Sequence, residues 1–380
     1  MTLPLITLLL TVALVTAVWR AVPALARPGL PFGVAVPPDR TDDPAIAQVR
    51  ERFARTVIAS GIGTAALALP AALLLDPEVV TAVAVVALVL SDTVAYALAG
   101  RRLRAAKTDG DWYAGAKQAV TADLGFRADP VRVPWLRAIP AALIFSATAA
   151  IGLARAGSLP ATLPGLDGLT LDSGPRVPTG FLTAANPVLA QAAVAIAVPL
   201  LLAAILRSRP EVDAARPADS ARRYRIYLRS LANLLLLAAA CVNLTLLGIA
   251  LRLWEIVPPA VAATALIFAP LAAAVAAAVV FEFRVGAGGH RLPAGPPEDT
   301  GLVQRDVDRH WHLGGFVYAN RSDPAILVHQ RAGGSQWTVN LGHPVGWGVA
   351  ALVVVITVLA IGAAVLDGLG LVDLPSTRGL

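Results

Sequence analysis

Eight long apolar runs constrain the fold of this 380-residue chain more than any other feature of its sequence. A helix needs about 20 apolar residues to cross the hydrocarbon core of a bilayer, and a spanning backbone must satisfy its own hydrogen bonds. We therefore predict an all-α polytopic membrane protein with about eight transmembrane helices. The expected spans are Thr2–Val18, Phe53–Leu75, Val79–Ala99, Leu136–Ala154, Asn186–Leu206, Leu231–Leu251, Val257–Phe281 and Val345–Leu366.

The composition is typical of a membrane protein, so we expect the lipid bilayer to be a partner of this chain. The sequence is 57% hydrophobic and 15% charged, whereas a soluble domain is nearer half apolar and a quarter charged. The first apolar run lacks a preceding basic segment and a clear cleavage site, so we expect it to be retained rather than removed as a signal peptide. One cysteine, Cys241, excludes an intramolecular disulfide and a cysteine-based zinc cluster. We expect no cofactor.

The distribution of lysine and arginine predicts the topology. The segments after the first, third, fifth and seventh spans hold 6, 8, 7 and 6 of the 31 basic residues. Cytoplasmic loops carry such an excess, so we expect these four segments inside and both termini outside a bacterial plasma membrane. The net charge of +6 is then explained by topology, and we expect no binding to nucleic acid.

Two local patterns refine the second span. Asp43 and Pro44 are typical of the N-cap and first position of a helix. The apolar residues that follow recur at helical spacing, so this helix should begin at Pro44 and continue into the membrane. Within the span, the small residues of Gly61–Ala66 predict close packing against a neighbouring helix.

The segment between the last two spans reads as strands rather than helix. We divide the chain into a membrane region (1–281), a cytoplasmic β-rich insert (282–344), and a final helix with an outer tail (345–380). Within the insert, Gly314–Ala319, Ala325–Arg331 and Gln336–Leu341 predict a small three-stranded β-meander.

The strand register of this insert follows from its turn. If Gly333 and Gly334 form a two-residue turn, Val328 faces Val339. That register separates an apolar face from a polar face. The apolar face would hold Ile326, Val328, Trp337, Val339 and Leu341, and the polar face His329, Thr338 and Asn340.

The histidines of the insert are candidates for a metal site. Zinc requires three or four ligands that converge. His310 and His312 lie on one side of an extended segment, but the predicted register leaves His329 in mid-strand and His343 beyond the strand end. We therefore expect these histidines to be polar residues on the surface of a small sheet.

A set of residues in the insert carries a resemblance. The pattern resembles a short bacterial domain of unknown function found on multipass membrane proteins. The matching positions are Trp311, Tyr318, Asn320, Asp323, Pro324, Trp337, Thr338, Asn340, Gly342 and Pro344.

Upstream, the stretches "LPFGVAVPPDR", "RRLRAAK" and "LPATLP" are similar to a membrane family related to the immunity proteins against a sporulation-delaying peptide toxin. A histidine usually follows the outer loop of that family, whereas Gly165 follows it here, so no role of that histidine is carried over. The resemblance implies a membrane accessory or immunity-type protein without an assigned reaction. No motif for a metalloprotease, a serine hydrolase or a P-loop is present, and we predict no enzyme.

Asp92 is the one acid well inside a predicted span. Ionisable groups within a bilayer are costly and mark functional sites by default. One interpretation is a proton-coupled or cation-coupled transport site, and the other is a structural tie to Asn233, Asn243 or Arg55.

Two functions follow from these patterns. We expect an immunity or sensor protein that binds a peptide toxin or another protein partner, with the insert anchoring the inner ends of the helices or docking a small cytoplasmic regulator. The insert should contact its partner through exposed aromatic residues. The alternative function is a secondary transporter that uses Asp92. The candidate residues of the insert are Trp311, Phe316, Tyr318, Asn320, Asp323, Trp337 and Asn340.

Overall fold

The computed structural model describes residues 2–120, 126, 129–166 and 170–368, and 66% of it is helical. The long helices are α1 (Thr2–Leu25), α2 (Pro44–Leu74), α3 (Pro77–Asp109), α5 (Ile139–Arg155), α6 (Phe181–Leu206), α7 (Pro217–Leu253), α8 (Val261–Arg284) and α9 (Pro344–Gly368). By length and composition, seven helices of the described chain, α1 to α8 in this series, are suited to crossing a membrane. The multi-pass character predicted from sequence is confirmed.

The last helix, α9, coincides with the eighth predicted span. The part of it whose side chains are described, Pro344–Leu359, is shorter than a membrane crossing requires. The count of eight spans therefore stays a prediction, as does the side of the membrane on which each loop lies.

The chain packs as two compact units. The first contains Met1–Ala128, Ser208–Tyr227 and Glu282–Val349. The second contains Asp129–Arg207, Leu228–Phe281 and Ala350–Leu380. Both α7 and α8 contribute to each unit, so a unit combines segments that are distant in sequence.

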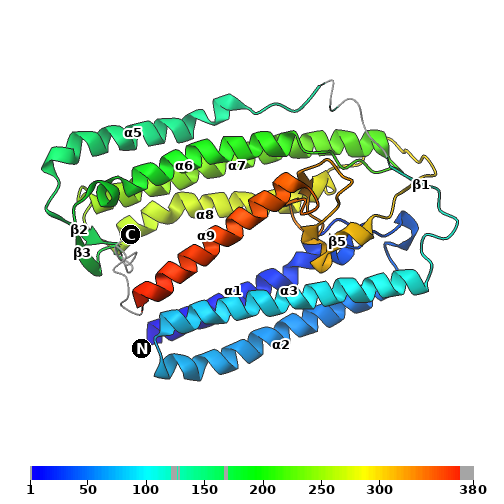
Figure 1. Ribbon diagram of the computed structural model, residues 1–380, viewed down its shortest axis with the longest axis horizontal. Coiled ribbons are helices and arrows are strands. Elements are labelled where there is room, and N and C mark those ends of the chain that lie inside the picture. Colours follow the sequence, from blue (N-terminus) through cyan, green and yellow to red (C-terminus); the bar gives the residue numbers. More distant parts are fainter. Residues whose placement is uncertain (1, 121–125, 127–128, 167–169, 369–380) are drawn as a thin grey trace. The chain divides into compact units, whose positions relative to one another are not determined.

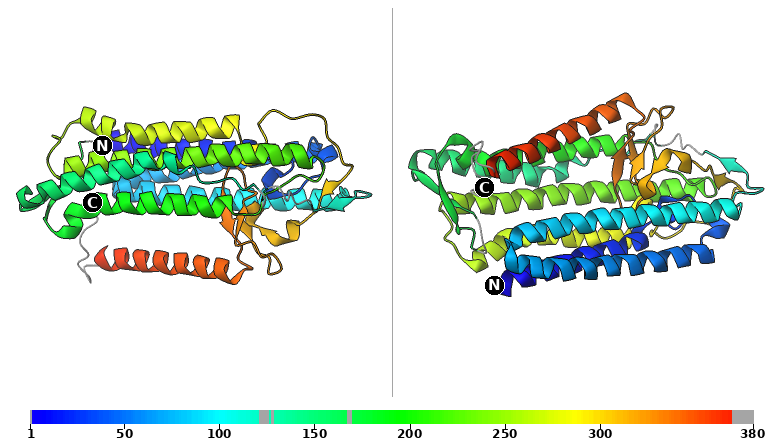
Figure 2. Two further views of the ribbon diagram at one scale, coloured as in Figure 1. Left: turned by 90° about the horizontal axis from the view of Figure 1, so that it is seen from above. Right: turned by 60° about the horizontal axis from the view of Figure 1, so that its bottom comes forward.

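Helices α1, α2 and α3 of the first unit lie alongside one another (Figures 1 and 2). As predicted, α2 begins at Pro44, and the Asp43 carboxylate accepts a hydrogen bond of 2.9 Å from the backbone N–H of Ala45. Asp76 caps α3 in the same way through the N–H of Glu78 at 2.8 Å. Such caps satisfy the first N–H groups of a helix, and they let both helices extend beyond their apolar runs.

The faces between these helices are closely packed. A buried stripe runs along α3 at steps of three and four residues, and it includes Leu88, Asp92 and Tyr96. On α2, a Cβ atom placed on Gly61 would lie only 2.3 Å from the Thr16 hydroxyl of α1. The close packing predicted for Gly61–Ala66 is therefore confirmed at Gly61.

We call residues 303–341 the cap. It contains β4 (Val303–Gln304), β5 (Trp311–His312), β6 (Val317–Tyr318), β7 (Leu327–His329) and β8 (Trp337–Val339). Strand β4 runs parallel to β1 (Gln118–Ala119), β5 pairs with β6, and β7 pairs with β8. A single parallel bridge between Tyr318 and Asn340 joins the last two pairs. Strands β6, β7 and β8 lie within the three predicted segments, but β6 is joined to the end of β8 and not to β7, so the strand order of the predicted meander is wrong.

The predicted register of the last hairpin is also wrong by one residue. Val328 pairs with Thr338, and His329 pairs with Trp337. The physical reason lies at Arg331, which leaves the ladder and donates its backbone N–H to the carbonyl of Gly315 at 3.1 Å. The connection is consequently longer than a two-residue turn, and His329 turns to the side on which Trp337 lies.

The second unit combines α5 and α6 with the apolar parts of α7 and α8. A hairpin of β2 (Thr162–Gly165) and β3 (Gly174–Pro178) packs Leu163 against Trp254, and both side chains are buried. Between the helices, Gln191 donates to the Thr148 hydroxyl at 3.0 Å and to the Asn243 carbonyl at 2.7 Å. Such ties stabilise helix packing where water is absent.

Gly33 and Gly314 of the first unit lie in close contact. The segment Phe32–Val36 is buried. A Cβ atom on Gly33 would lie 2.2 Å from the carbonyl oxygen of Gly314, and both glycines have positive φ, at +73° and +69°. Only glycine allows this approach at this conformation.

We predict that Gly33→Ala destabilises the first unit by clearly more than the roughly 1–2 kcal/mol that a positive φ costs an alanine. The excess comes from the clash with Gly314. Gly115→Ala is the matched control, because Gly115 has a φ of +70° and open space around it. Thermal unfolding of the purified variants measures both, and equal losses would contradict the prediction.

Candidate functional site

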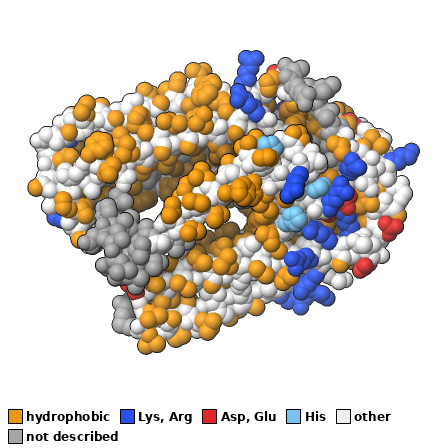
Figure 3. Space-filling view, in the orientation of Figure 1, with side chains coloured by type: hydrophobic (Ala, Val, Ile, Leu, Met, Phe, Trp, Pro, Cys, Tyr) orange, Lys and Arg blue, Asp and Glu red, His pale blue; other side chains and the backbone are white. Residues whose placement is uncertain are grey.

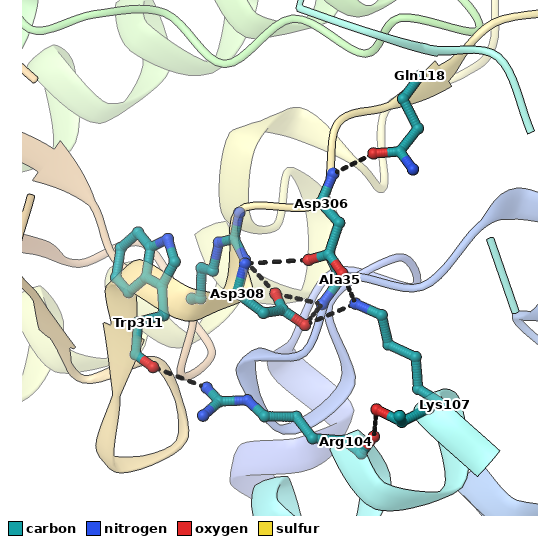
Figure 4. Close-up of polar contacts among 9 residues, drawn as sticks. Ala35, Arg104, Lys107, Gln118, Asp306, Asp308 and Trp311 are labelled. Carbon is teal, nitrogen blue, oxygen red and sulfur yellow. Dashed lines mark hydrogen bonds and ion pairs between the residues drawn. The ribbon is translucent and has the colours of Figure 1, made fainter. Parts of the chain in front are cut away.

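The carboxylate of Asp308 is the centre of a buried polar cluster in the first unit (Figure 4). It accepts hydrogen bonds from the Lys107 ammonium of α3 and from Arg331 of the cap, each at 2.8 Å. It also accepts the backbone N–H of Ala35 at 3.0 Å. Three segments that are far apart in sequence therefore meet at one side chain.

A second acid completes the charge balance of this cluster. Asp306 lies 2.7 Å from the Lys107 ammonium and accepts the backbone N–H of Asp308 at 3.0 Å. Two acids thus face two cations, Lys107 and Arg331, and all of these side chains except the partly exposed Asp306 are buried. One helical turn before Lys107, Arg104 donates to the carbonyl of Trp311 at 2.9 Å, so α3 holds the cap at two successive turns.

A further cluster joins the segments that flank α1 and α7 to the cap. Arg27, after α1, forms an ion pair with Glu211, before α7. The His329 Nδ1 atom lies 3.8 Å from the Glu211 carboxylate, and its Nε2 atom lies 3.3 Å from the Tyr227 hydroxyl. His329 is 1% exposed and packs on the Trp337 ring at 4.7 Å. The expectation that His329 lies on a polar surface is therefore wrong.

The environment of this cluster lowers the pKa of His329 and the pKa of Glu211. Burial lowers the pKa of His329, and the positive charge of Arg27 lowers it further. Burial alone would raise the pKa of the Glu211 carboxyl, but Arg27 and His329 together hold it well below its usual range. His329 is therefore neutral and Glu211 ionised near pH 7.

Figure 3 shows where charge gathers on one face of the molecule: Lys, Arg and His side chains cluster over the cap, while the lengths of the helices are mainly hydrophobic. Among the described residues, however, no group of three or more His, Cys, Asp or Glu side chains is arranged to hold a metal ion. Of the four histidines considered from sequence, His329 points into the aromatic cluster, and His343 follows β8.

Motif residues of the cap form internal contacts. The Tyr318 hydroxyl donates to the Asp323 carboxylate at 2.8 Å, and Arg209 lies 3.1 Å from the same oxygen. Asn320 accepts the backbone N–H of Ser322 at 3.0 Å, and Asp323 accepts that of Ala325 at 3.0 Å. The Tyr-x-Asn and Asp-Pro elements therefore build the turn between β6 and β7.

Asn340 ties this turn to the last strand. Its side-chain oxygen accepts the backbone N–H groups of Asn320 and Gly342, each at 2.9 Å. Its amide nitrogen donates to the carbonyls of Asn320, Asp323 and Ala325 at 2.9 to 3.1 Å. The side chain is fully buried, so its predicted place on a polar face is wrong. Its amide group supplies hydrogen bonds that longer strands would form between their backbones.

The aromatic side chains predicted to be exposed contacts are mostly buried. Trp311 and Tyr318 are 3% and 4% exposed, and their rings pack at 4.7 Å across the β5–β6 pair. Phe316 is partly buried against Trp19 and Tyr96 of α1 and α3. Trp337 donates its indole N–H to the Ser208 hydroxyl at 3.3 Å. The prediction that Trp311 and Tyr318 are exposed is wrong, because each ring covers the other.

Asp92 lies on α3 between Leu88 and Tyr96, and all three side chains are fully buried. No hydrogen bond to either carboxylate oxygen comes from the described part of the chain. On the neighbouring faces of α2 and α3, the Ser60 hydroxyl lies 2.9 Å from that of Ser91. Arg55, a predicted tie, pairs instead with Glu51 at 3.0 Å.

No protein-family model, curated protein or solved structure matches the chain. The resemblance to the toxin-immunity family therefore stays a prediction from the sequence.

Sequence reasoning missed the ionic residues that hold the cap, Lys107, Asp308, Glu211 and Arg27. A signal existed for Asp308, because it is an acid three residues before the motif residue Trp311. Two of its partners, Lys107 and Ala35, come from more than 200 residues earlier, and no local pattern indicates that distance.

We predict that Asp308→Asn lowers the free energy of unfolding of the first unit by about 3 kcal/mol or more, because it leaves buried cations without their counter-charge. Glu51→Gln should change it little, since Glu51 and Arg55 form an exposed pair. Denaturant unfolding in detergent measures both variants, and a loss no larger in Asp308→Asn than in Glu51→Gln would be inconsistent with the cluster.

We predict that acidification destabilises the first unit. The unfolded chain binds a proton at His329 more readily than the folded chain does, because the folded pKa is lowered. Stability is therefore full above an ordinary histidine pKa of about 6.5 and falls as the pH drops below it. Glu211, whose folded pKa is also lowered, adds a further loss as the pH falls below about 4.3.

The measurement is the melting temperature from about pH 7.5 to pH 5 in buffers of constant ionic strength. His329→Gln should flatten the profile between these values, whereas His312→Gln, at an exposed position, should leave it unchanged. A profile unaffected by His329→Gln would show that other groups cause the acid sensitivity.

Proposed function

We propose that the chain is a non-catalytic membrane sensor of the immunity type. It binds a hydrophobic peptide or a protein partner within the bilayer or at an outer loop, and it reports that binding through the cap. In this proposal the cap faces the cytoplasm of a bacterium, because the basic residues concentrate in the segments after the odd-numbered spans.

The observation that carries the proposal is the buried carboxylate of Asp308, which joins α3, the segment after α1 and the cap. A buried ionic cluster has few alternative arrangements, since a partner left alone is costly. A displacement of α3 within the membrane would have to be followed by the cap or would break the cluster. This rigid connection supports a role in signalling across the membrane.

The burial of Trp311 and Tyr318 limits how a regulator would dock. The large apolar side chains that the cap leaves exposed are Leu313 and Ile326, at 51% and 41%. We propose that a small cytoplasmic regulator contacts these two residues rather than the aromatic rings predicted from sequence.

The test is protection of a bacterium that is sensitive to the sporulation-delaying peptide toxin. Expression of the chain should raise survival, and Lys107→Met should abolish this effect at equal membrane abundance because it removes a partner of Asp308. Arg55→Gln is the control, since Arg55 lies outside the cluster. Unchanged survival with the wild-type chain present in the membrane would contradict the proposal.

Asp92 favours a second candidate function, a secondary transporter. A carboxylate buried without a hydrogen-bond donor in the described chain requires a proton or cation as its companion within a bilayer. Binding and release of that companion would couple to the movement of a substrate. The nearby hydroxyls of Ser60 and Ser91 would supply polar neighbours for it.

Proteoliposomes that contain a trapped pH-sensitive dye separate the two functions. A transporter should move protons when a sodium or potassium gradient is imposed, and Asp92→Asn should abolish that movement. Asp109→Asn, at an exposed position near the end of α3, is the matched control. Equal fluxes for the wild type and Asp92→Asn would rule against the transporter.

A further inference from the structure

A cavity of about 700 Å³ opens in the first unit where the end of α1 meets the residues around the end of α8. Part of its lining is apolar and comes from helix ends, namely Pro23 and Ala24 of α1 and Phe283 of α8. The polar part of the lining includes Arg50, His290 and Arg291. The cavity therefore lies at the border between apolar and basic surface.

The arginines of this cavity differ in how they are held. Arg291 donates to the carbonyl of Ala24 at 2.8 Å and lies 5.3 Å from the centre of the Phe283 ring. These contacts fix its guanidinium at the helix ends and leave further donors available. Arg50 is exposed on α2, and within the described residues it forms no ion pair.

The electrostatic potential in the cavity is positive. Burial lowers the pKa of His290, and the charges of Arg291, Arg27 and Arg223 lower it further. Asp42 is the acid among the lining residues, and it offsets part of this charge. An anion that enters meets at least two guanidinium groups with one opposing carboxylate.

We propose that this cavity binds the phosphate group of an anionic membrane lipid, with Arg50 and Arg291 as its ligands. Arginine donors match phosphate oxygens, and basic pockets at the ends of membrane helices bind lipid head groups. A lipid fits better than a free phosphate ion because exposed apolar side chains of the same unit, Val18, Ile58 and Phe283, offer surface for acyl chains.

The test uses the purified full chain in phosphatidylcholine nanodiscs that contain increasing fractions of phosphatidylglycerol. Native mass spectrometry counts retained phosphatidylglycerol, and thermal unfolding reports the stabilisation that binding produces. Arg50→Gln should weaken apparent affinity about fivefold, which corresponds to roughly 1 kcal/mol for one arginine near a charged membrane. Asp42→Asn should strengthen it.

Arg55→Gln is the matched control, because it removes the same charge from the same helix outside the cavity. An equal loss in Arg55→Gln would show a general surface-charge effect and overturn the proposal, as would unchanged binding in Arg50→Gln. Inorganic phosphate serves as the competing probe. If it stabilises the chain in pure phosphatidylcholine as strongly as phosphatidylglycerol does, the ligand is a free anion and the assignment to lipid is wrong.

Discussion

Two cations and one backbone N–H converge on the carboxylate of Asp308, in a place that water hardly reaches. Each partner would be left buried and unpaired if another moved away, so the cluster resists partial opening. It fixes the distance between Lys107 of α3 and the cap. The contacts of Trp311 with Arg104 and of Gly314 with Gly33 then follow at neighbouring positions. The packing of the first unit depends on this one charged group.

The features that sequence predicts well are those that depend on local chemistry. Apolar length predicts the membrane helices, and the Asp43–Pro44 pair predicts the start of α2 to the residue. The register of β7 and β8 does not depend on local chemistry alone, because the backbone N–H of Arg331 bonds to the carbonyl of Gly315 and lengthens the hairpin loop. The burial of His329 likewise depends on Arg27 and Glu211, which approach from separate parts of the chain. Long-range partners of this kind leave no periodic trace in a sequence.

The motif residues of the cap illustrate a distinction between conformation and function. Tyr318, Asp323 and Asn340 saturate one another and the backbone around them with hydrogen bonds. A strand pair of two or three residues is too short to be stable alone, so side-chain amides and carboxylates take over the role of a longer ladder. Asp92 is the opposite case, since its carboxylate is buried without such saturation among the described residues. A polar group whose surroundings leave it unsatisfied is the better candidate for chemistry.

The meeting of Gly33 and Gly314 also sets an order of events during synthesis. About 280 residues separate the two glycines, and at bacterial or eukaryotic rates of elongation a ribosome needs roughly 15 to 60 seconds to add them. Throughout that interval Phe32 and its apolar neighbours have no cap to cover them, although α1 and α2 already exist. Phe32 can meanwhile pack on Phe53 of α2 and Tyr96 of α3, whose rings lie 5.4 and 5.1 Å from its own. A chain truncated before residue 314 would keep that packing and lack the close approach of the cap to Gly33.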